Sequence, residues 1–301
     1  TTTTTTINIS YDSQRLQKKS IKIQSLLHND KTVNMRILGE LCWAGLPSNV
    51  RSECWKLLLG YIPANLSRRS STLSRRRDEY HRFVAEYYDI DDIQRSTSEK
   101  KILKQIQLDV PRTCQKQTLF QQTKVKQILE RVLYIWSIRH TASGYVQGIN
   151  DLATPFFIVF LLGKTTTTTT TTTTGINYDD AIDLLALLED YDIDSLDDVL
   201  LKEIEADTFM CLTQLLNSIQ DHYTHAQPGI QKKVYKLSEL IRRIDEDLYK
   251  HLLQENVPFM HFAYRWMNCL LMRELSLPLV IRLWDTYMSE HSNTQGDGFS
   301  D

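Results

Sequence analysis

Residues 229–252 read GIQKKVYKLSELIRRIDEDLYKHL, and this stretch indicates the fold class of the chain. Its apolar residues follow one another at steps of three or four, at Ile230, Val234, Leu237, Ile241, Ile244, Leu248 and Leu252. Because an α-helix has about 3.6 residues per turn, such positions share one face while the charged residues occupy the other. The stretch therefore predicts a single amphipathic helix whose apolar face packs against a core.

The same period recurs along the rest of the chain. It is found in residues 125–136, in residues 209–219, and around Phe259, Phe262, Trp266 and Leu270. Residues 49–59 form a further predicted helix, with Ser48 as its N-cap and Gly60 as its stop. Alternating apolar and polar runs joined by hairpin turns are absent, so the sequence predicts an all-α architecture.

The composition excludes several classes of function. The chain has 301 residues, 42% of them apolar, and a formal net charge of −2, which gives no overall attraction to nucleic acid or to anionic lipid. Its five cysteines are dispersed and without paired spacing, which favours reduced thiols in the cytoplasm over disulfides or zinc. The longest apolar run, residues 156–162, is far shorter than the roughly 20 residues of a spanning helix. Any membrane contact is expected to be peripheral.

Two threonine runs, residues 1–6 and 165–174, are set aside as low-complexity segments, tags or placeholders. Residues 1–30 are predicted to be an N-terminal extension, and residues 31–301 the folded domain, with a mobile loop at about 163–178.

Two segments carry a strong charge bias. Residues 67–77 contain five arginines and no acid, and residues 179–207 are crowded with Asp and Glu. Solvated surface is the favoured interpretation of both. Ser70 and Ser71 follow two arginines, which is typical of a basophilic kinase site or a docking site for an adaptor.

Most catalytic templates are missing from the sequence. Neither a G-x-x-x-x-G-K-[ST] nor a G-x-G-x-x-G motif is present, so the chain has no sequence basis for binding a nucleotide by itself. His222 and His225 have the spacing to share a metal on a helix, but no partnered ligand motif accompanies them. We therefore expect no metal and no cofactor.

The segment Asp109-Val110-Pro111-Arg112 contains a better candidate. Proline fixes its own backbone angle and restricts the preceding residue, so Arg112 follows a rigid corner, with Asp109 placed to accept a hydrogen bond from it. A guanidinium is planar and permanently charged, which suits the charge of a transferring phosphoryl group. The competing interpretation is an ordinary Asp–Arg pair on the surface.

Residues 142–151 read ASGYVQGIND and place Gln147 close to two of the chain's ten glycines, Gly144 and Gly148. Glycine gives the backbone room to turn sharply or to approach another molecule. A neutral amide donates and accepts at once, which is what positioning a water against a phosphate requires. A simple helix-to-helix turn with Gln147 idle in solvent remains open.

These two motifs, Ile106-x-x-Asp109-x-x-Arg112 and Tyr145-x-Gln147-Gly148, resemble the paired signatures of the TBC domain of Rab GTPase-activating proteins. Further family landmarks match in order, from Trp43-Ala44-Gly45-Leu46-Pro47-x-x-x-Arg51-x-x-x-Trp55 to Arg265-Trp266-Met267 and Leu283-Trp284-Asp285. The resemblance covers about residues 41–287. Residues 144–151, 205–209 and 265–274 are similar to the Golgi-associated, Gyp-one-like branch.

The resemblance implies a V-shaped domain of two helical subdomains that accelerates GTP hydrolysis by a Rab. Arg112 is then the arginine finger and Gln147 the glutamine finger, with Asp109, Tyr145, Arg51 and Gly148 in supporting or orienting roles. GTP and Mg²⁺ belong to the Rab. The resemblance also implies peripheral association with Golgi or endosomal membranes, and it leads us to expect further C-terminal helices beyond this chain.

Two other functions compete with this interpretation. The first is a non-catalytic TBC scaffold that binds a GTPase or another trafficking partner. The second is a helical adaptor with no link to a GTPase, built around the basic residues 67–77. Intact Arg112 and Gln147 argue against a pure scaffold.

Overall fold

The computed structural model describes residues 2–29, 31–168 and 181–293, and these form thirteen α-helices with no β-strand among them. The predicted all-α class is confirmed. The helices are α1 (Thr2–His28), α2 (Met35–Trp43), α3 (Ser48–Leu58), α4 (Leu66–Phe83), α5 (Thr97–Asp109), α6 (Thr123–Arg139), α7 (Ile149–Thr168), α8 (Ala181–Asp190), α9 (Asp198–Ser218), α10 (Pro228–Ile244), α11 (Glu246–Gln254), α12 (Phe259–Asn268) and α13 (Leu277–Asn293). A π-helix, η1 (Val84–Tyr88), and four short 3-10 helices, η2 (Val110–Arg112), η3 (Thr118–Gln121), η4 (Ile193–Ser195) and η5 (Gln220–His222), connect them.

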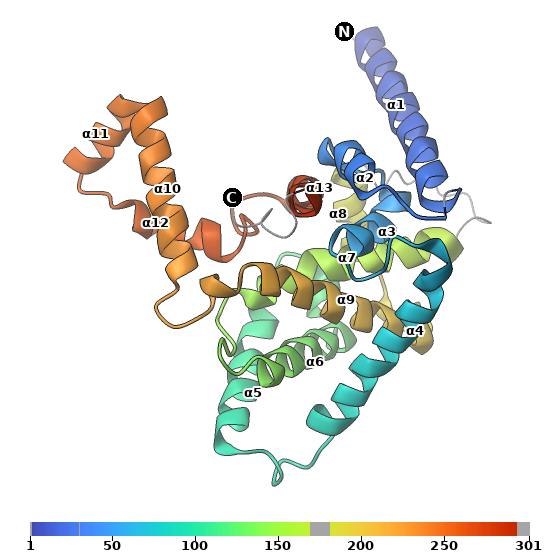
Figure 1. Ribbon diagram of the computed structural model, residues 1–301, viewed down its shortest axis with the longest axis vertical. Coiled ribbons are helices and arrows are strands. Elements are labelled where there is room, and N and C mark those ends of the chain that lie inside the picture. Colours follow the sequence, from blue (N-terminus) through green and yellow to red (C-terminus); the bar gives the residue numbers. More distant parts are fainter. Residues whose placement is uncertain (1, 30, 169–180, 294–301) are drawn as a thin grey trace.

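The main body is built around α7. Every residue from Ile149 to Leu162 is buried, because α3, α6, α9 and α13 surround this helix (Figure 1). Trp55 of α3, Phe156 of α7 and Trp284 of α13 pack ring against ring, with centroids 5.5 to 6.2 Å apart. The apolar run of residues 156–162 is therefore a core helix. Within the described residues, no helix has the length and apolar character needed to cross a membrane.

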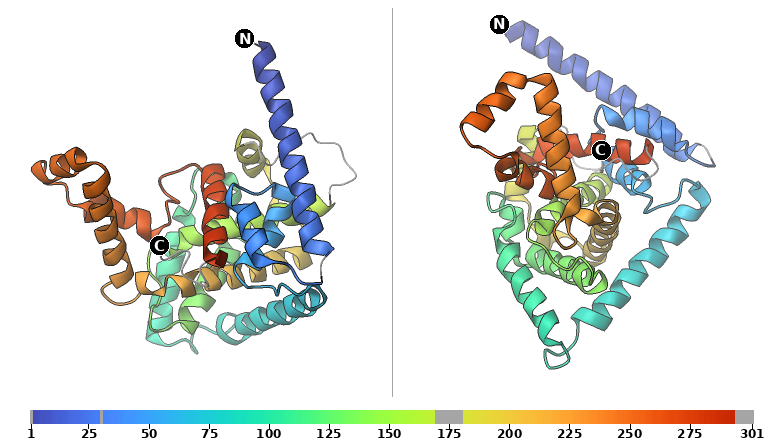
Figure 2. Two further views of the ribbon diagram at one scale, coloured as in Figure 1. Left: turned by 45° about the horizontal axis from the view of Figure 1, so that its top comes forward. Right: turned by 60° about the vertical axis from the view of Figure 1, so that its left-hand side comes forward.

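A second, smaller core forms an arm made of α10, α11 and α12. Ile230, Val234, Phe259 and Ala263 are buried together in it, apart from the main core. The chain leaves the main core at Tyr223 and rejoins it at Cys269. Figures 1 and 2 show this arm projecting from the main body, which agrees with the predicted pair of helical subdomains.

The decisive stretch at residues 229–252 is two helices and not the single predicted one. α10 ends at Ile244, and Asp245 takes a non-helical backbone (φ −142°, ψ 78°). The Asp245 carboxylate then accepts a hydrogen bond from the backbone N–H of Leu248, at 3.0 Å, and caps α11. The apolar residues that face the small core lie on either side of the break, at Leu237 and Ile241 of α10 and at Leu252 of α11. Ile244 and Leu248, which flank the break itself, are exposed.

The predicted N-cap of α3 is also wrong by one residue. Ser48 is the first helical residue and Pro47 takes the cap position, where its ring has no hydrogen-bond acceptor for the first turn.

The charge-biased segments are only partly solvated, so the surface interpretation fails for their most interior members. Asp207 on α9 is fully buried, and Arg77 on α4 donates to it twice, at 2.8 Å. Lys56 and Tyr61 bind the same carboxylate. Because these opposite charges pair across two helices, the runs hold α4 against α9. Ser70 and Ser71 are exposed within helix α4.

The two threonine runs, which were left out of the fold prediction, differ in how much of each the structure describes. Residues 2–6 belong to α1, and the last turns of α1 insert Ile23 and Leu27 into the main core. Residues 163–168 continue α7, whereas the rest of the predicted mobile loop, residues 169–178, lies outside the described residues.

Candidate functional site

Arg112 ends a short 3-10 helix that continues directly from α5. Pro111 occupies the first turn of that helix, and the Thr113 N–H closes it on the Val110 carbonyl at 3.0 Å. The side chain of Arg112 is exposed. Within the described residues it forms no hydrogen bond or ion pair, so the predicted bond to Asp109 is not made.

Asp109 points into the protein instead. The residue is 2% exposed, and its carboxylate accepts hydrogen bonds from Gln105 at 3.2 Å and from the Tyr145 hydroxyl at 3.1 Å. Burial, together with the Asp109 carboxylate, raises the pKa of the Tyr145 phenol well above its usual range, so this phenol stays a donor. Tyr145 thereby ties the loop before α7 to the end of α5.

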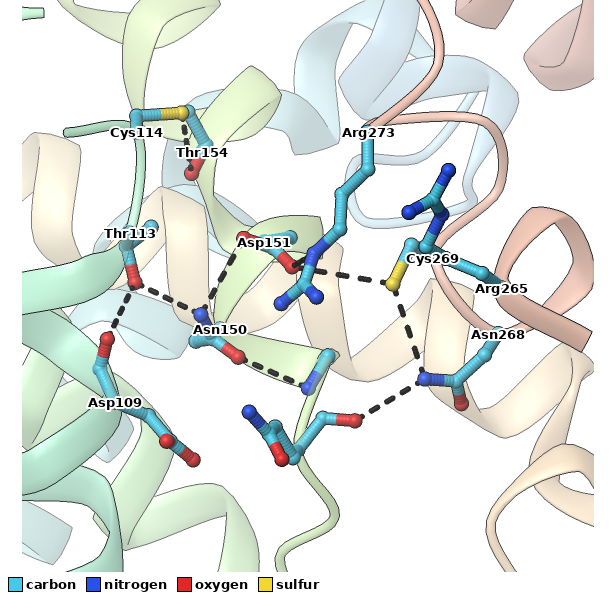
Figure 3. Close-up of polar contacts among 12 residues, drawn as sticks. Asp109, Thr113, Cys114, Asn150, Asp151, Thr154, Arg265, Asn268, Cys269 and Arg273 are labelled. Atoms are coloured by element: carbon cyan, nitrogen blue, oxygen red, sulfur yellow. Dashed lines mark hydrogen bonds and ion pairs between the residues drawn. The ribbon is translucent and has the colours of Figure 1, made fainter. Parts of the chain in front are cut away.

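A second set of hydrogen bonds joins the two loops through Asn150. Its amide donates to the Thr113 hydroxyl at 2.8 Å and accepts from the Gly148 N–H at 3.0 Å. Thr113 in turn donates to the Asp109 carbonyl at 3.2 Å. Figure 3 shows Asn150 between Thr113 and Asp151, and all these groups are buried. The Arg112 corner and the Gln147 loop are therefore one connected unit.

The two glycines of the Gln147 loop are needed for different reasons. Gly144 has φ 65° with open space where a Cβ would lie, so only its backbone angle favours glycine. Gly148 has φ 112°, and a Cβ there would lie 2.4 Å from the Asn268 amide nitrogen. The backbone at Gly148 thus both turns sharply and lies against another part of the chain.

Gln147 itself is exposed, and its side chain has no partner among the described residues. Its backbone carbonyl accepts a hydrogen bond of 3.1 Å from Asn268, at the end of α12. The amide of Gln147 is therefore free to act while its main chain is held.

Arg273 adds a cation to the same region. Its Nε donates to the largely buried Asp151 carboxylate at 2.7 Å, and its side chain is 42% exposed. Burial raises the pKa of Asp151, and the Arg273 charge opposes that shift. Figure 3 shows Arg273 and Cys269 reaching α7 from the loop that follows α12.

Arg51 is not part of this network. It is buried between α3 and α13, where its Nε donates to Asp285 at 3.1 Å and its terminal nitrogen to the Leu46 carbonyl. Trp55 donates to the same carboxylate at 2.8 Å. The expectation that Arg51 orients the arginine side of the site is replaced by a core ion pair that joins two helices of the main body.

The chemistry available at the surface of this site is that of two exposed donors on a rigid base. Arg112 offers a planar guanidinium, and Gln147 offers an amide that donates and accepts. No group of three or more His, Cys, Asp or Glu side chains among the described residues could hold a metal ion. His222 is buried and His225 is exposed, so the two imidazoles do not face a common site. A pocket of about 460 Å³ lies along α10 and is closed by Met267 of α12, and neither Arg112 nor Gln147 lines it.

Sequence reasoning missed the residues that join the loops. Thr113, Asn150, Asp151, Asn268 and Arg273 have no individual role among the sequence predictions. The hydrogen bond from Gly148 to Asn150 spans two residues and restrains the loop rather than the helix. Only Gly148, as a glycine beside a polar residue, gave a local signal that another chain segment lies close.

The chain is similar to known proteins over most of its length. A sequence model of the Rab-GTPase-TBC domain matches residues 48–295. Human TBC1 domain family member 22B is 47% identical over 269 residues, which are 89% of this chain and 49% of that protein. The GTPase-activating protein gyp1 of Schizosaccharomyces pombe is 46% identical over 270 residues, which are 90% of this chain and 49% of that protein.

A solved structure is similar as well. The crystal structure of the Ypt/Rab-GAP domain of Gyp1p matches with a TM-score of 0.81 at 39% identity, over 94% of this chain and 83% of that one. The chain spans about half the length of the curated relatives it matches.

Proposed function

This chain belongs to the Rab-GTPase-TBC domain family, and we propose from that premise that it accelerates GTP hydrolysis by a Rab small GTPase. The relatives named gyp1 and TBC1 domain family member 22 confirm the predicted Gyp1-like branch. One observation carries the proposal: Arg112 and Gln147, both exposed, stand on two loops that buried hydrogen bonds join into one unit.

Arg112 acts in this proposal as the arginine finger. Negative charge spreads over the phosphate oxygens as the bond between the β and γ phosphates breaks, and a guanidinium donates to two of those oxygens at once. The rigid 3-10 corner limits the entropy lost when the side chain enters the partner's site. Such a finger supplied in trans is worth about three to five orders of magnitude in rate.

Gln147 acts as the glutamine finger. Its carbonyl oxygen accepts from the attacking water while its amide nitrogen donates to a neighbouring oxygen, so the water is aligned with the γ-phosphate. Asp109 and Tyr145 support this role, because their hydrogen bond joins the loop that carries Gln147 to the end of α5.

The nucleotide and its Mg²⁺ belong to the partner in this proposal, since the sequence has no phosphate-binding loop of its own. Recruitment to Golgi or endosomal membranes, and kinase or adaptor docking at the exposed Ser70 and Ser71, are further parts of the proposal. They rest on the family resemblance and on the sequence motif.

Single-turnover GTP hydrolysis by a panel of Rabs tests the activity. We expect acceleration of a few Rabs, with a loss of about three orders of magnitude or more for Arg112→Ala. Arg112→Lys should be nearly as inactive, because an ammonium cannot donate two parallel hydrogen bonds. Gln147→Ala should lose hundreds-fold, by roughly 3 to 4 kcal/mol in the barrier, while Rab binding persists.

Matched controls are available on the exposed surface. Arg68→Ala on α4 and Gln17→Ala on α1 remove the same side-chain types away from the two loops and should leave the rate unchanged. A folded protein that binds Rabs in the GTP state but accelerates none of them would instead support the scaffold function.

A further inference from the structure

Asn268 stands where the arm rejoins the main body, directly against the glutamine loop. The residue is 5% exposed, and its Nδ2 donates to the Gln147 carbonyl at 3.1 Å. The backbone of Asn268 is fixed as well, because its own carbonyl accepts from the buried Tyr223 hydroxyl at 2.8 Å. The chain leaves the main core at Tyr223, so both ends of the arm meet at this residue.

The orientation of the Asn268 amide is decided by Gln147. Its Oδ1 is buried without a hydrogen-bond partner among the described residues. Turning the amide over would place Oδ1 against the Gln147 carbonyl oxygen and would also end the 3.8 Å contact from Nδ2 to the Cys269 Sγ. The uncompensated Oδ1 indicates that this residue is held for the donor it presents.

The space at Gly148 fits the same contact. Any Cβ there would lie 2.4 Å from the Asn268 Nδ2 and 3.2 Å from the Cys269 Sγ. The loop backbone therefore approaches the end of α12 as closely as glycine permits. Together, the donor, its fixed backbone and the missing Cβ form a clamp on the Gln147–Gly148 peptide.

We infer that Asn268 is a positioning residue for the glutamine finger, through which the α10–α12 arm fixes the Gln147 main chain. This inference rests on the proposed Rab GTPase-activating function. A misplacement of about 1 Å at a catalytic group can lower a rate by about a hundredfold. Losing the clamp should act on the rate of the bound complex and leave Rab binding intact.

Asn268→Asp is the sharpest test, because it keeps the shape and replaces the donor with an acceptor that repels the Gln147 carbonyl. We expect the saturating single-turnover rate to fall by about a hundredfold while the half-saturating concentration stays within about twofold. Asn268→Leu should behave alike. Asn217→Asp, at an exposed position of α9, is the matched control and should leave both the saturating rate and the half-saturating concentration unchanged.

A double-mutant cycle separates positioning from general damage. In the Gln147→Ala background, Asn268→Asp should cause no further loss, because the side chain that it positions is gone. An equal loss in both backgrounds, a change confined to the half-saturating concentration, or an unchanged rate would overturn the inference.

Hydrogen exchange gives a readout that needs no Rab. Asn268→Asp should speed deuterium uptake in residues 144–151 and leave α3 and α9 unchanged. If the wild-type protein accelerates no Rab, the proposed function fails, and this exchange still decides whether Asn268 holds the loop. Unchanged uptake in residues 144–151 would overturn the inference.

Discussion

At the scale of single residues, the two glycines of the glutamine loop provide a matched pair of substitutions. Gly148→Ala places a Cβ against the Asn268 amide at a backbone angle, φ 112°, that L-residues rarely adopt. We expect it to lower the free energy of unfolding by about 1 to 3 kcal/mol and to lower the GTPase-activating rate severely. Urea denaturation and single-turnover hydrolysis measure the two effects.

Gly144→Ala is the control for this substitution. Its φ of 65° lies in the left-handed region, and no atom lies within 4 Å of the new Cβ. We expect a loss of about 1 kcal/mol in stability and activity close to that of the wild type. Equal losses of activity in both variants would mean that backbone angle alone, and not the contact with Asn268, decides the loop.

The exposed residues of the site could be predicted from the sequence, whereas the buried hydrogen bonds that hold them could not. Arg112 and Gln147 have distinctive neighbours, a proline corner and a pair of glycines, so their exposure on loops was predictable. The hydrogen bond between Asn150 and Thr113 has no such local signal, because these two residues are 37 positions apart in the chain. Such a pairing is a property of the folded topology and cannot be derived from spacing.

At the scale of elements, the break between α10 and α11 depends on one side chain. No residue of α11 is buried, so this helix relies on its cap more than a core helix does. Asp245→Ala removes the acceptor for the Leu248 N–H, and we expect the opening free energy of α11 to fall by about 1 kcal/mol. Hydrogen exchange of the α11 amides should then become about fivefold faster.

Asp245→Asn is the conservative counterpart, because Asn caps helices about as well as Asp. It should restore most of the protection of α11. If Ala and Asn speed exchange equally, the charge at the first turn and not the capping bond holds this end.

Periodicity predicted correctly that residues 229–252 are helical, but it did not show that they form two helices. The apolar period of residues 229–252 runs on through Ile244 and Leu248, but both side chains are exposed where α10 ends and α11 begins, so the period does not report burial there. Charge runs mislead in a similar way. The arginines of residues 67–77 suggested exposed surface because the sequence does not show that Arg77 pairs with Glu203 and Asp207, which are far away in the chain.

At the scale of the whole molecule, the main body and the arm are two cores joined at a narrow junction. The η5 helix lies on one of its connections, and it buries His222 with 1% exposure. Burial, followed by the nearby Lys233 charge, lowers the pKa of His222 to about 4, against the opposing effects of Asp221 and of a hydrogen bond with the Met267 backbone. The junction therefore contains a histidine that the fold keeps neutral.

This burial makes stability depend on pH. The unfolded chain takes up a proton at His222 near pH 6.5, whereas the folded chain does so only near its pKa of about 4. The neutral form is therefore favoured by folding, and stability is complete above about pH 6.5 and falls as the pH drops toward 4. The full loss is about 3 kcal/mol, since each pKa unit is worth about 1.4 kcal/mol.

Urea denaturation at pH 7, 6 and 5 measures this loss against two variants. His222→Gln keeps a polar side chain without a titrating group, so its stability should fall less steeply over this range than that of the wild type. His225→Gln, at an exposed position three residues along, should follow the wild-type curve. Parallel curves for the wild type and His222→Gln would show that proton uptake at the junction does not control unfolding. A flattened curve would place the acid-sensitive point of the molecule between its two cores, where the arm that holds the glutamine loop begins.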